Sequence, residues 1–171
     1  MNSLIRKLRI KKWIKDGLIV GKNFQLERNS FIDSSFPWLI QIGDNVTIAP
    51  DSLILSHDGS TQKFVGYSRL GKVKIGNNVF IGAKCIILPN TTIGDNTIIG
   101  AGSIVKGNVD SDSIYCGIIA KKIKTIEEFK IYEENKLKDA IKYGIEYTKK
   151  GKINKVKKRE MINEEKDMFV I

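Results

Sequence analysis

The stretch that decides the fold is residues 75–105, IGNNVFIGAKCIILPNTTIGDNTIIGAGSIV, in which isoleucine or valine returns at every sixth position. The fifth position of each six-residue repeat is small or β-branched, as at Val79, Cys85, Thr91, Thr97 and Ser103. This pattern suits triangular coils of about 18 residues, each made of three short strands and stacked ~4.8 Å from the next. The aliphatic residue fills the interior, where a large fifth residue would clash. The period therefore predicts a parallel β-helix.

The same repeat continues toward the N-terminus. First positions fall at Ile42, Ile48 and Ile54, and a weaker turn precedes them at Val20, Leu26 and Ile32. The predicted corners carry Asp44-Asn45, Asn77-Asn78 and Asp95-Asn96, which supply the positive φ that tight turns need. A β-sandwich would instead alternate with period two and turn every 8–12 residues. The six-residue rule therefore favours the β-helix over the sandwich.

Breaks in the repeat divide the chain into segments. Residues 60–74 interrupt the period and form an extra loop, and such a loop in a strict solenoid is usually functional. Residues 18–124 form the β-helix. Residues 125–171 form a charged extension in which apolar residues recur at helical spacing over 125–148.

Positive charge is concentrated at the two ends of the chain, whose net charge is +10. Residues 1–16 carry six Lys or Arg and one Asp. Such a chain can meet nucleic acid, an acidic membrane surface or a phosphorylated small molecule. No alternation of aromatic and basic residues supports nucleic acid. We expect residues 1–17 to include a helix that caps the first coil with Leu4, Ile5 and Leu8 inward, and a peripheral membrane contact through its basic residues stays open.

Targeting signals and cysteines point to the cytoplasm. No apolar segment follows the basic N-terminus, so no signal peptide is expected. Cys85 and Cys116 lack the spacing of metal ligands or of a disulfide framework.

Three segments of the repeat resemble motifs of the hexapeptide-repeat acetyltransferases, namely Ile75–Ala83, Ile93–Asn96 and Ile99–Val105. This family includes galactoside, maltose and capsular-polysaccharide O-acetyltransferases. The resemblance covers about residues 18–124. It implies an all-β fold, a left-handed parallel β-helix with a C-terminal α-helical extension, that assembles as a homotrimer. The implied reaction moves an acetyl group from acetyl-CoA to a hydroxyl of a sugar or polysaccharide precursor.

His57 is the only histidine, and it stands where the repeat gives way to the extra loop. Members of this family carry a catalytic histidine at this junction, so the resemblance implies that His57 is the general base. A neutral imidazole can take the proton of a sugar hydroxyl as the oxygen attacks a thioester. In the galactoside and maltose enzymes the histidine lies about two residues further from the Ala-Pro corner than His57 lies from Ala49-Pro50. The sequence His57-Asp58-Gly59-Ser60 is similar to that of capsular-type relatives.

The resemblance also implies where the donor binds. The backbone amide of Ala83 would stabilise the oxyanion across a subunit interface from His57. Coenzyme A would contact Ala101, Lys106, Lys121 and Lys124. The Gly-Asn-Pro-Ala word common in the family is Gly117-Ile118-Ile119-Ala120 here, so the shape of that loop departs from the family pattern.

Two carboxylates are candidates for binding the acceptor. Relatives hold a sugar hydroxyl with a carboxylate near the position of Asp33, although Asp33 could equally cap its own turn. Asp58 could bind acceptor or orient His57.

Three alternative functions share parts of this pattern. A γ-type carbonic anhydrase needs three histidines on zinc, and this chain has one, so no metal is expected. An N-acetyltransferase acting on an amino sugar or an antibiotic would use the same histidine. A non-catalytic scaffold would use only the positive charge.

Overall fold

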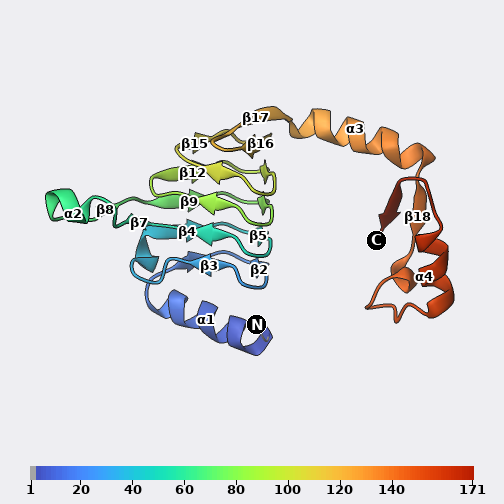
Figure 1. The fold of residues 1–171 in the computed structure, drawn as a ribbon, viewed down its shortest axis with the longest axis horizontal. Helices are drawn as coiled ribbons and strands as arrows, with labels where there is room; N and C mark the ends of the chain where they lie inside the picture. The colour runs from blue at the N-terminus through green and yellow to red at the C-terminus, as the bar shows by residue number, and fades with distance from the viewer. Residues whose placement is uncertain (1–2) are drawn as a thin grey trace. The chain divides into compact units, whose positions relative to one another are not determined.

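A computed structural model describes residues 3–171, which form two compact units, residues 3–126 and 127–171. In the first unit, short parallel strands stack into three sheets (Figure 1). Sheet 1 contains β1 (Ile19–Val20), β4 (Ile40–Ile42), β9 (Val73–Ile75), β12 (Thr91–Ile93) and β15 (Asn108–Val109). Sheet 2 contains β2 (Gln25–Leu26), β5 (Thr47–Ile48), β10 (Phe80–Ile81), β13 (Ile98–Ile99), β16 (Ser113–Gly117) and the antiparallel β17 (Ala120–Thr125). Sheet 3 contains β3 (Phe31–Ile32), β6 (Leu53–Ile54), β11 (Ile86–Ile87) and β14 (Ile104–Val105).

The chain passes from sheet 1 to sheet 2 to sheet 3 and then begins the next coil, which confirms the predicted parallel β-helix. The aliphatic first positions from Leu26 to Val105 are buried, and so are the small fifth positions. Val109 departs from the pattern. Predicted as a fifth position, it pairs with Ile93 on sheet 1 as a first position does, because the last corner is two residues shorter.

The corner between sheets 1 and 2 is held by a column of asparagines, which we call the asparagine ladder. Each side-chain amide donates to the next coil, at 2.9 Å from Asn23 to Asn45, 2.9 Å from Asn45 to Asn78 and 3.0 Å from Asn78 to Asn96. All four residues have positive φ, between 52° and 56°. Asparagine tolerates this conformation better than other non-glycine residues, so each residue both turns the chain and joins two coils.

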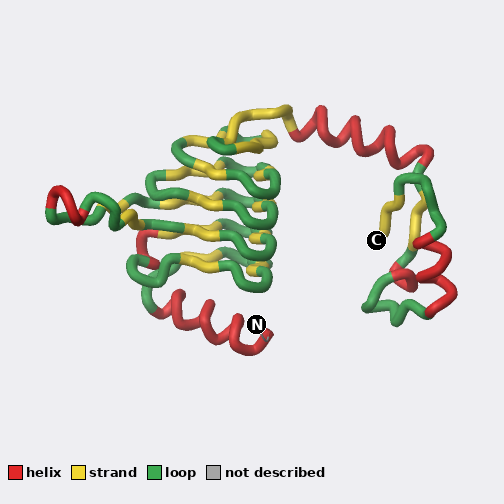
Figure 2. The backbone as a smooth tube through the Cα atoms, in the orientation of Figure 1, coloured by secondary structure: helices red, strands yellow, loops and turns green. Residues whose placement is uncertain are grey.

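The extra loop leaves the prism after β6 and returns before β9, as the smooth trace in Figure 2 shows. It contains β7 (His57–Asp58), α2 (Gln62–Val65) and β8 (Arg69–Leu70), with β7 and β8 paired antiparallel. Expected at residues 60–74, it spans 55–72 in the structure, because Val73 and Lys74 already pair with β4 and β12. His57 therefore lies inside the loop.

The N-terminal helix α1 (Ser3–Lys15) covers the first coil with a different face from the expected one. Trp13 is 4% exposed and joins the core together with Ile10. The prediction that Leu4, Ile5 and Leu8 point inward is wrong, because these side chains are 62%, 51% and 58% exposed.

The remaining elements also include helices, so the chain is not all-β. Between the first and second coils lies η1 (Pro37–Leu39). The second unit contains α3 (Ile126–Asp139), β18 (Ile141–Tyr143), η2 (Ile145–Tyr147), α4 (Lys155–Ile162) and β19 (Met168–Val170). The helix expected over 125–148 ends at Asp139, because residues 141–143 pair in parallel with residues 168–170. Within residues 3–171, no helix has the length and apolar character needed to cross a membrane.

Candidate active site

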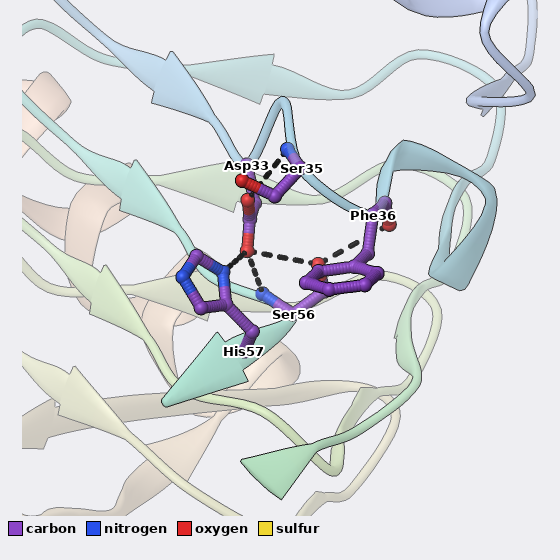
Figure 3. Close-up of polar contacts among 5 residues, drawn as sticks. All are labelled: Asp33, Ser35, Phe36, Ser56 and His57. Atoms are coloured by element: carbon purple, nitrogen blue, oxygen red, sulfur yellow. Dashed lines mark hydrogen bonds and ion pairs between the residues drawn. The ribbon is translucent and has the colours of Figure 1, made fainter. Parts of the chain in front are cut away.

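The candidate site is centred on His57 and Asp33, which come from neighbouring coils. Asp33 follows β3, and His57 follows β6 by three residues. Because Ile32 pairs with Ile54 across sheet 3, the residue after Ile32 is stacked under the start of the extra loop. The imidazole Nδ1 of His57 lies 2.5 Å from Oδ2 of Asp33 (Figure 3).

Asp33 is a buried carboxylate whose oxygens are occupied by donors. Its side chain is 1% exposed. Oδ2 accepts hydrogen bonds from the backbone N–H and the hydroxyl of Ser56, both at 3.0 Å, and Oδ1 accepts from the backbone N–H of Ser35 at 3.0 Å. Burial acts to raise the pKa of Asp33, but the hydrogen bonds from His57, Ser35 and Ser56 outweigh it and leave the pKa below its ordinary value. Asp33 is therefore held as the ionised form.

The imidazole ring has one fixed side and one accessible side. The Phe36 ring packs edge-on against it, with centroids 5.5 Å apart, and Asp33 engages Nδ1. The His57 side chain is 35% exposed, and Figure 3 shows Nε2 pointing away from Asp33. A carboxylate at Nδ1 favours the tautomer with hydrogen on Nδ1, which leaves the lone pair of Nε2 available as a base.

A cleft of about 510 Å³ lies beside His57. Its walls come from the extra loop and from the corners where sheet 3 returns to sheet 1. The lining residues are Leu55, His57, Asp58, Gly59, Arg69, Leu88, Pro89, Asn90 and Lys106. The cleft thus places the His57 imidazole near two cationic side chains, Arg69 and Lys106, and one carboxylate, Asp58. The apolar part of its wall comes from Leu55, Leu88 and Pro89.

The two carboxylates that are candidates for binding the acceptor lie in different places. Asp58 lines the cleft, and hydrogen bonds from Ser60 lower the pKa of its exposed carboxyl. Asp33 lies beneath His57 instead of lining the cleft. Aligning the first positions Ile32 and Ile54 would have revealed this, because it stacks Asp33 one coil away from Leu55 and next to His57.

The corner between sheets 2 and 3 holds two of the residues implied for the donor site. Ala83 and Ala101 occupy this corner on successive coils, and the Ala83 carbonyl accepts from the Gly102 N–H at 2.8 Å. In the part of the chain that the structure describes, the backbone N–H groups of Ala83 and Ala101 donate no hydrogen bond. A Cβ on Gly82 would lie 2.5 Å from the Ala101 nitrogen, so only glycine permits this stacking.

Lys121 continues the same line toward the end of the prism. A Cβ on Gly100 would lie 2.8 Å from Sγ of Cys116, and Cys116 pairs with Lys121 between β16 and β17. Lys124 lies on β17 opposite Ile114. Two backbone donors and a basic strand are therefore aligned along one edge of the prism.

Lys106 lies at a different corner from these residues. It shares the cleft with His57, and the strands of sheet 3 separate that cleft from Ala83 and Ala101. Within a single chain the expected base and the expected oxyanion donor are thus on two corners of the prism. Within residues 3–171, no group of three His, Cys, Asp or Glu side chains is arranged to hold a metal ion.

Known proteins share this repeat. A family model described as bacterial transferase hexapeptide (six repeats) matches residues 72–107. Protein CapG of Staphylococcus aureus is 40% identical over 169 residues, which cover 95% of this chain and 92% of CapG. The match therefore includes the C-terminal unit as well as the prism.

Two solved structures are each similar to about two thirds of this chain. A maltose O-acetyltransferase from Clostridium difficile 630 superposes with a TM-score of 0.56 and 36% identity, covering 64% of this chain and 59% of that protein. A galactoside acetyltransferase in complex with coenzyme A gives a TM-score of 0.53 and 31% identity, covering 66% of this chain and 62% of that protein. The chain thus spans about three fifths of each of these two proteins.

Proposed function

The chain belongs to the hexapeptide-repeat transferase family, and from this premise we propose that it is an acetyl-CoA-dependent O-acetyltransferase. The acceptor is a hydroxyl of a sugar or polysaccharide precursor. The observation that carries the proposal is the contact between His57 Nδ1 and the buried Asp33 carboxylate at the edge of a cleft. Its relatives include proteins named maltose O-acetyltransferase and galactoside acetyltransferase. The left-handed winding of the coils is also proposed, from the resemblance to this family.

His57 is the general base in this proposal. A sugar hydroxyl is a weak nucleophile at neutral pH, and Nε2 of a neutral imidazole can accept its proton as the oxygen attacks the acetyl carbonyl. The imidazolium that forms is stabilised by the Asp33 carboxylate at Nδ1. The same Nε2 then returns a proton to the departing thiolate. Ser56 and Ser35 keep Asp33 in place and ionised, so Asp33 is a positioning residue.

The edge formed by Ala83, Ala101 and Lys121 fits an elongated phosphorylated donor. Free backbone N–H groups at Ala83 and Ala101 suit the oxyanion and the amide groups of the pantetheine arm. The lysines of β17 suit the phosphates, and charged contacts of this kind weaken as ionic strength rises. Lys106, in the cleft of His57, is proposed to contact the same donor.

A homotrimer is part of the proposal because one chain separates the two halves of the site. His57 and Ala83 occupy different corners of the prism, so a neighbouring copy is needed to bring an Ala83 amide to a His57 imidazole. Light scattering should therefore report three copies at micromolar concentration. A stable monomer that catalyses acetyl transfer would contradict this arrangement.

Thiol release from acetyl-CoA tests the function. Sugars, nucleotide sugars and amino sugars are offered as acceptors to the wild type, to His57→Ala and to the matched variant Asp139→Asn, which changes an exposed carboxylate of the second unit. We expect turnover that depends on a hydroxyl acceptor, is lost in His57→Ala and persists in Asp139→Asn. Absence of coenzyme A binding by calorimetry would refute the enzyme assignment, whereas turnover confined to amino groups would identify an N-acetyltransferase.

A further inference from the structure

The N-terminal helix α1 has two faces of different chemistry. Its 13 residues include six Lys or Arg and no acidic residue. The inner face contacts the prism: Trp13 is buried, Arg6 forms an ion pair with Glu27 at 3.4 Å, and the Arg9 guanidinium lies 4.9 Å from the Trp13 ring centroid. Both arginines are therefore engaged on the inner side.

The outer face of α1 consists of three aliphatic side chains and four lysines, and we call it the lysine–leucine face. At 100° per residue the seven positions lie on one side of the helix, opposite Ile10 and Trp13. All seven are exposed: Leu4, Ile5, Lys7, Leu8, Lys11, Lys12 and Lys15. Within residues 3–171, none of the four lysines lies within ion-pair distance of a carboxylate.

We propose that the lysine–leucine face docks the protein on the surface of an anionic phospholipid bilayer. A helix that lies in a membrane interface combines aliphatic side chains, which enter the acyl boundary, with lysines that meet anionic headgroups. Each lysine near such a surface raises the membrane partition coefficient by roughly five-fold, and the contributions of clustered lysines multiply. Nucleic acid would use the lysines but leave the leucines in water. The combination therefore favours a lipid surface.

The position of α1 suits this role. Figure 1 shows the helix lying across the end of the prism, beyond the first coil, with its axis across the stack. Docking through its outer face leaves every coil on the far side of the helix from the lipid. His57 emerges from the second coil counted from α1. The inference rests on α1 alone and holds whatever the acceptor of the cleft is.

Sedimentation of the full chain with lipid vesicles tests the proposal. We expect binding to vesicles of phosphatidylcholine with phosphatidylglycerol and little binding to phosphatidylcholine alone. Reversing the four lysines (Lys7→Glu, Lys11→Glu, Lys12→Glu and Lys15→Glu) should reduce binding roughly 100-fold or more. The matched control reverses four exposed lysines of the second unit, Lys149, Lys150, Lys155 and Lys158, changes net charge equally and should keep most of the binding.

A second variant tests the aliphatic part of the face. Leu4→Ser, Ile5→Ser and Leu8→Ser together remove exposed side chains, so circular dichroism should show an intact fold while vesicle binding falls at least ten-fold. If this variant bound vesicles as tightly as the wild type, the lysines alone would account for vesicle binding, and docking through the aliphatic side chains would be overturned. Equal binding to both kinds of vesicle, or retention on duplex DNA without vesicle binding, would overturn the proposal too. Acetyl transfer to a soluble acceptor should be unchanged in every variant.

Discussion

Two corners of the same prism use side-chain hydrogen bonds between coils for different ends. In the asparagine ladder Asn45 and Asn78 each accept a hydrogen bond from the coil before and donate one to the coil after, so both amides are satisfied by their neighbours. At the corner after sheet 3, Asp33 accepts from Ser56 and His57 of the next coil, and there the column stops because the extra loop begins. A continued column yields stability, and an interrupted one leaves a reactive nitrogen beside a cleft.

The largest loss of activity is expected when His57, the last member of the interrupted column, is removed. His57→Ala should lower kcat/KM for acetyl transfer by about 10²–10⁴-fold, because no other imidazole can replace the base. The unfolding temperature should change little, since the ring is one-third exposed. Thiol-release kinetics and calorimetry measure both. A fully active His57→Ala protein would place the chemistry elsewhere.

Removing the charge below the imidazole gives a smaller loss. Asp33→Asn keeps the size of the side chain but should lower kcat by about 10–100-fold with little change in KM, because the imidazolium loses its partner. Asp139→Asn is the control, since that carboxyl is exposed on the second unit and does not line the cleft. If the two variants had the same kinetics, Asp33 would not position His57.

The ladder should respond in stability alone. Asn78→Ala removes two side-chain hydrogen bonds and places alanine at a φ of 55°, so the free energy of unfolding should fall by about 1–3 kcal/mol. Asn78→Gly removes the same hydrogen bonds but tolerates the dihedral angle, so its loss should be smaller. Denaturant titration measures both variants, and activity at saturating substrate should match the wild type. A drop in kcat would mean that the two corners are coupled.

Acid provides the mildest test of the difference between the corners. The folded pKa of Asp33 lies below its ordinary value of 3.8. Its ionised form therefore stabilises the fold above that value, and the contribution is lost as the pH falls through the folded pKa. The difference in the free energy of unfolding between the wild type and Asp33→Asn should be constant above about pH 5 and should decrease below it. Asparagine has no titratable group, so the difference in the free energy of unfolding between the wild type and Asn78→Ala should stay nearly constant.

The sequence was most informative where the six-residue period is strict. From Ile75 to Val105 it predicted each inward side chain, because every coil repeats the environment of the one before. The period also located His57 at the edge of an interruption. The contact between Asp33 and His57 was not predicted, because the two residues are 24 positions apart and only the stacking of Ile32 on Ile54 brings them together.

Elements outside the repeat were predicted less well, for a physical reason. A helix such as α1 buries only a narrow stripe, and the choice of Ile10 and Trp13 over the leucines depends on the shape of the first coil. The end of α3 depends on a partner strand almost 30 residues later in the chain. Both outcomes follow from tertiary contacts that local spacing does not encode.

The closure of the extra loop has a consequence for how the protein can diversify. The loop is pinched at its base, where the Gly71 N–H donates to the Ser56 carbonyl at 2.9 Å and β7 pairs with β8. The entropic cost of closing a loop grows only with the logarithm of its length. Doubling the segment beyond the pinch therefore lowers the free energy of unfolding by about 0.6 kcal/mol. Insertions between β7 and β8 can reshape one wall of the cleft at little thermodynamic penalty, while His57, in the paired base of the loop, keeps its contact with Asp33. Homologous proteins with this fold can thus differ in the acceptor they prefer while the prism itself stays the same.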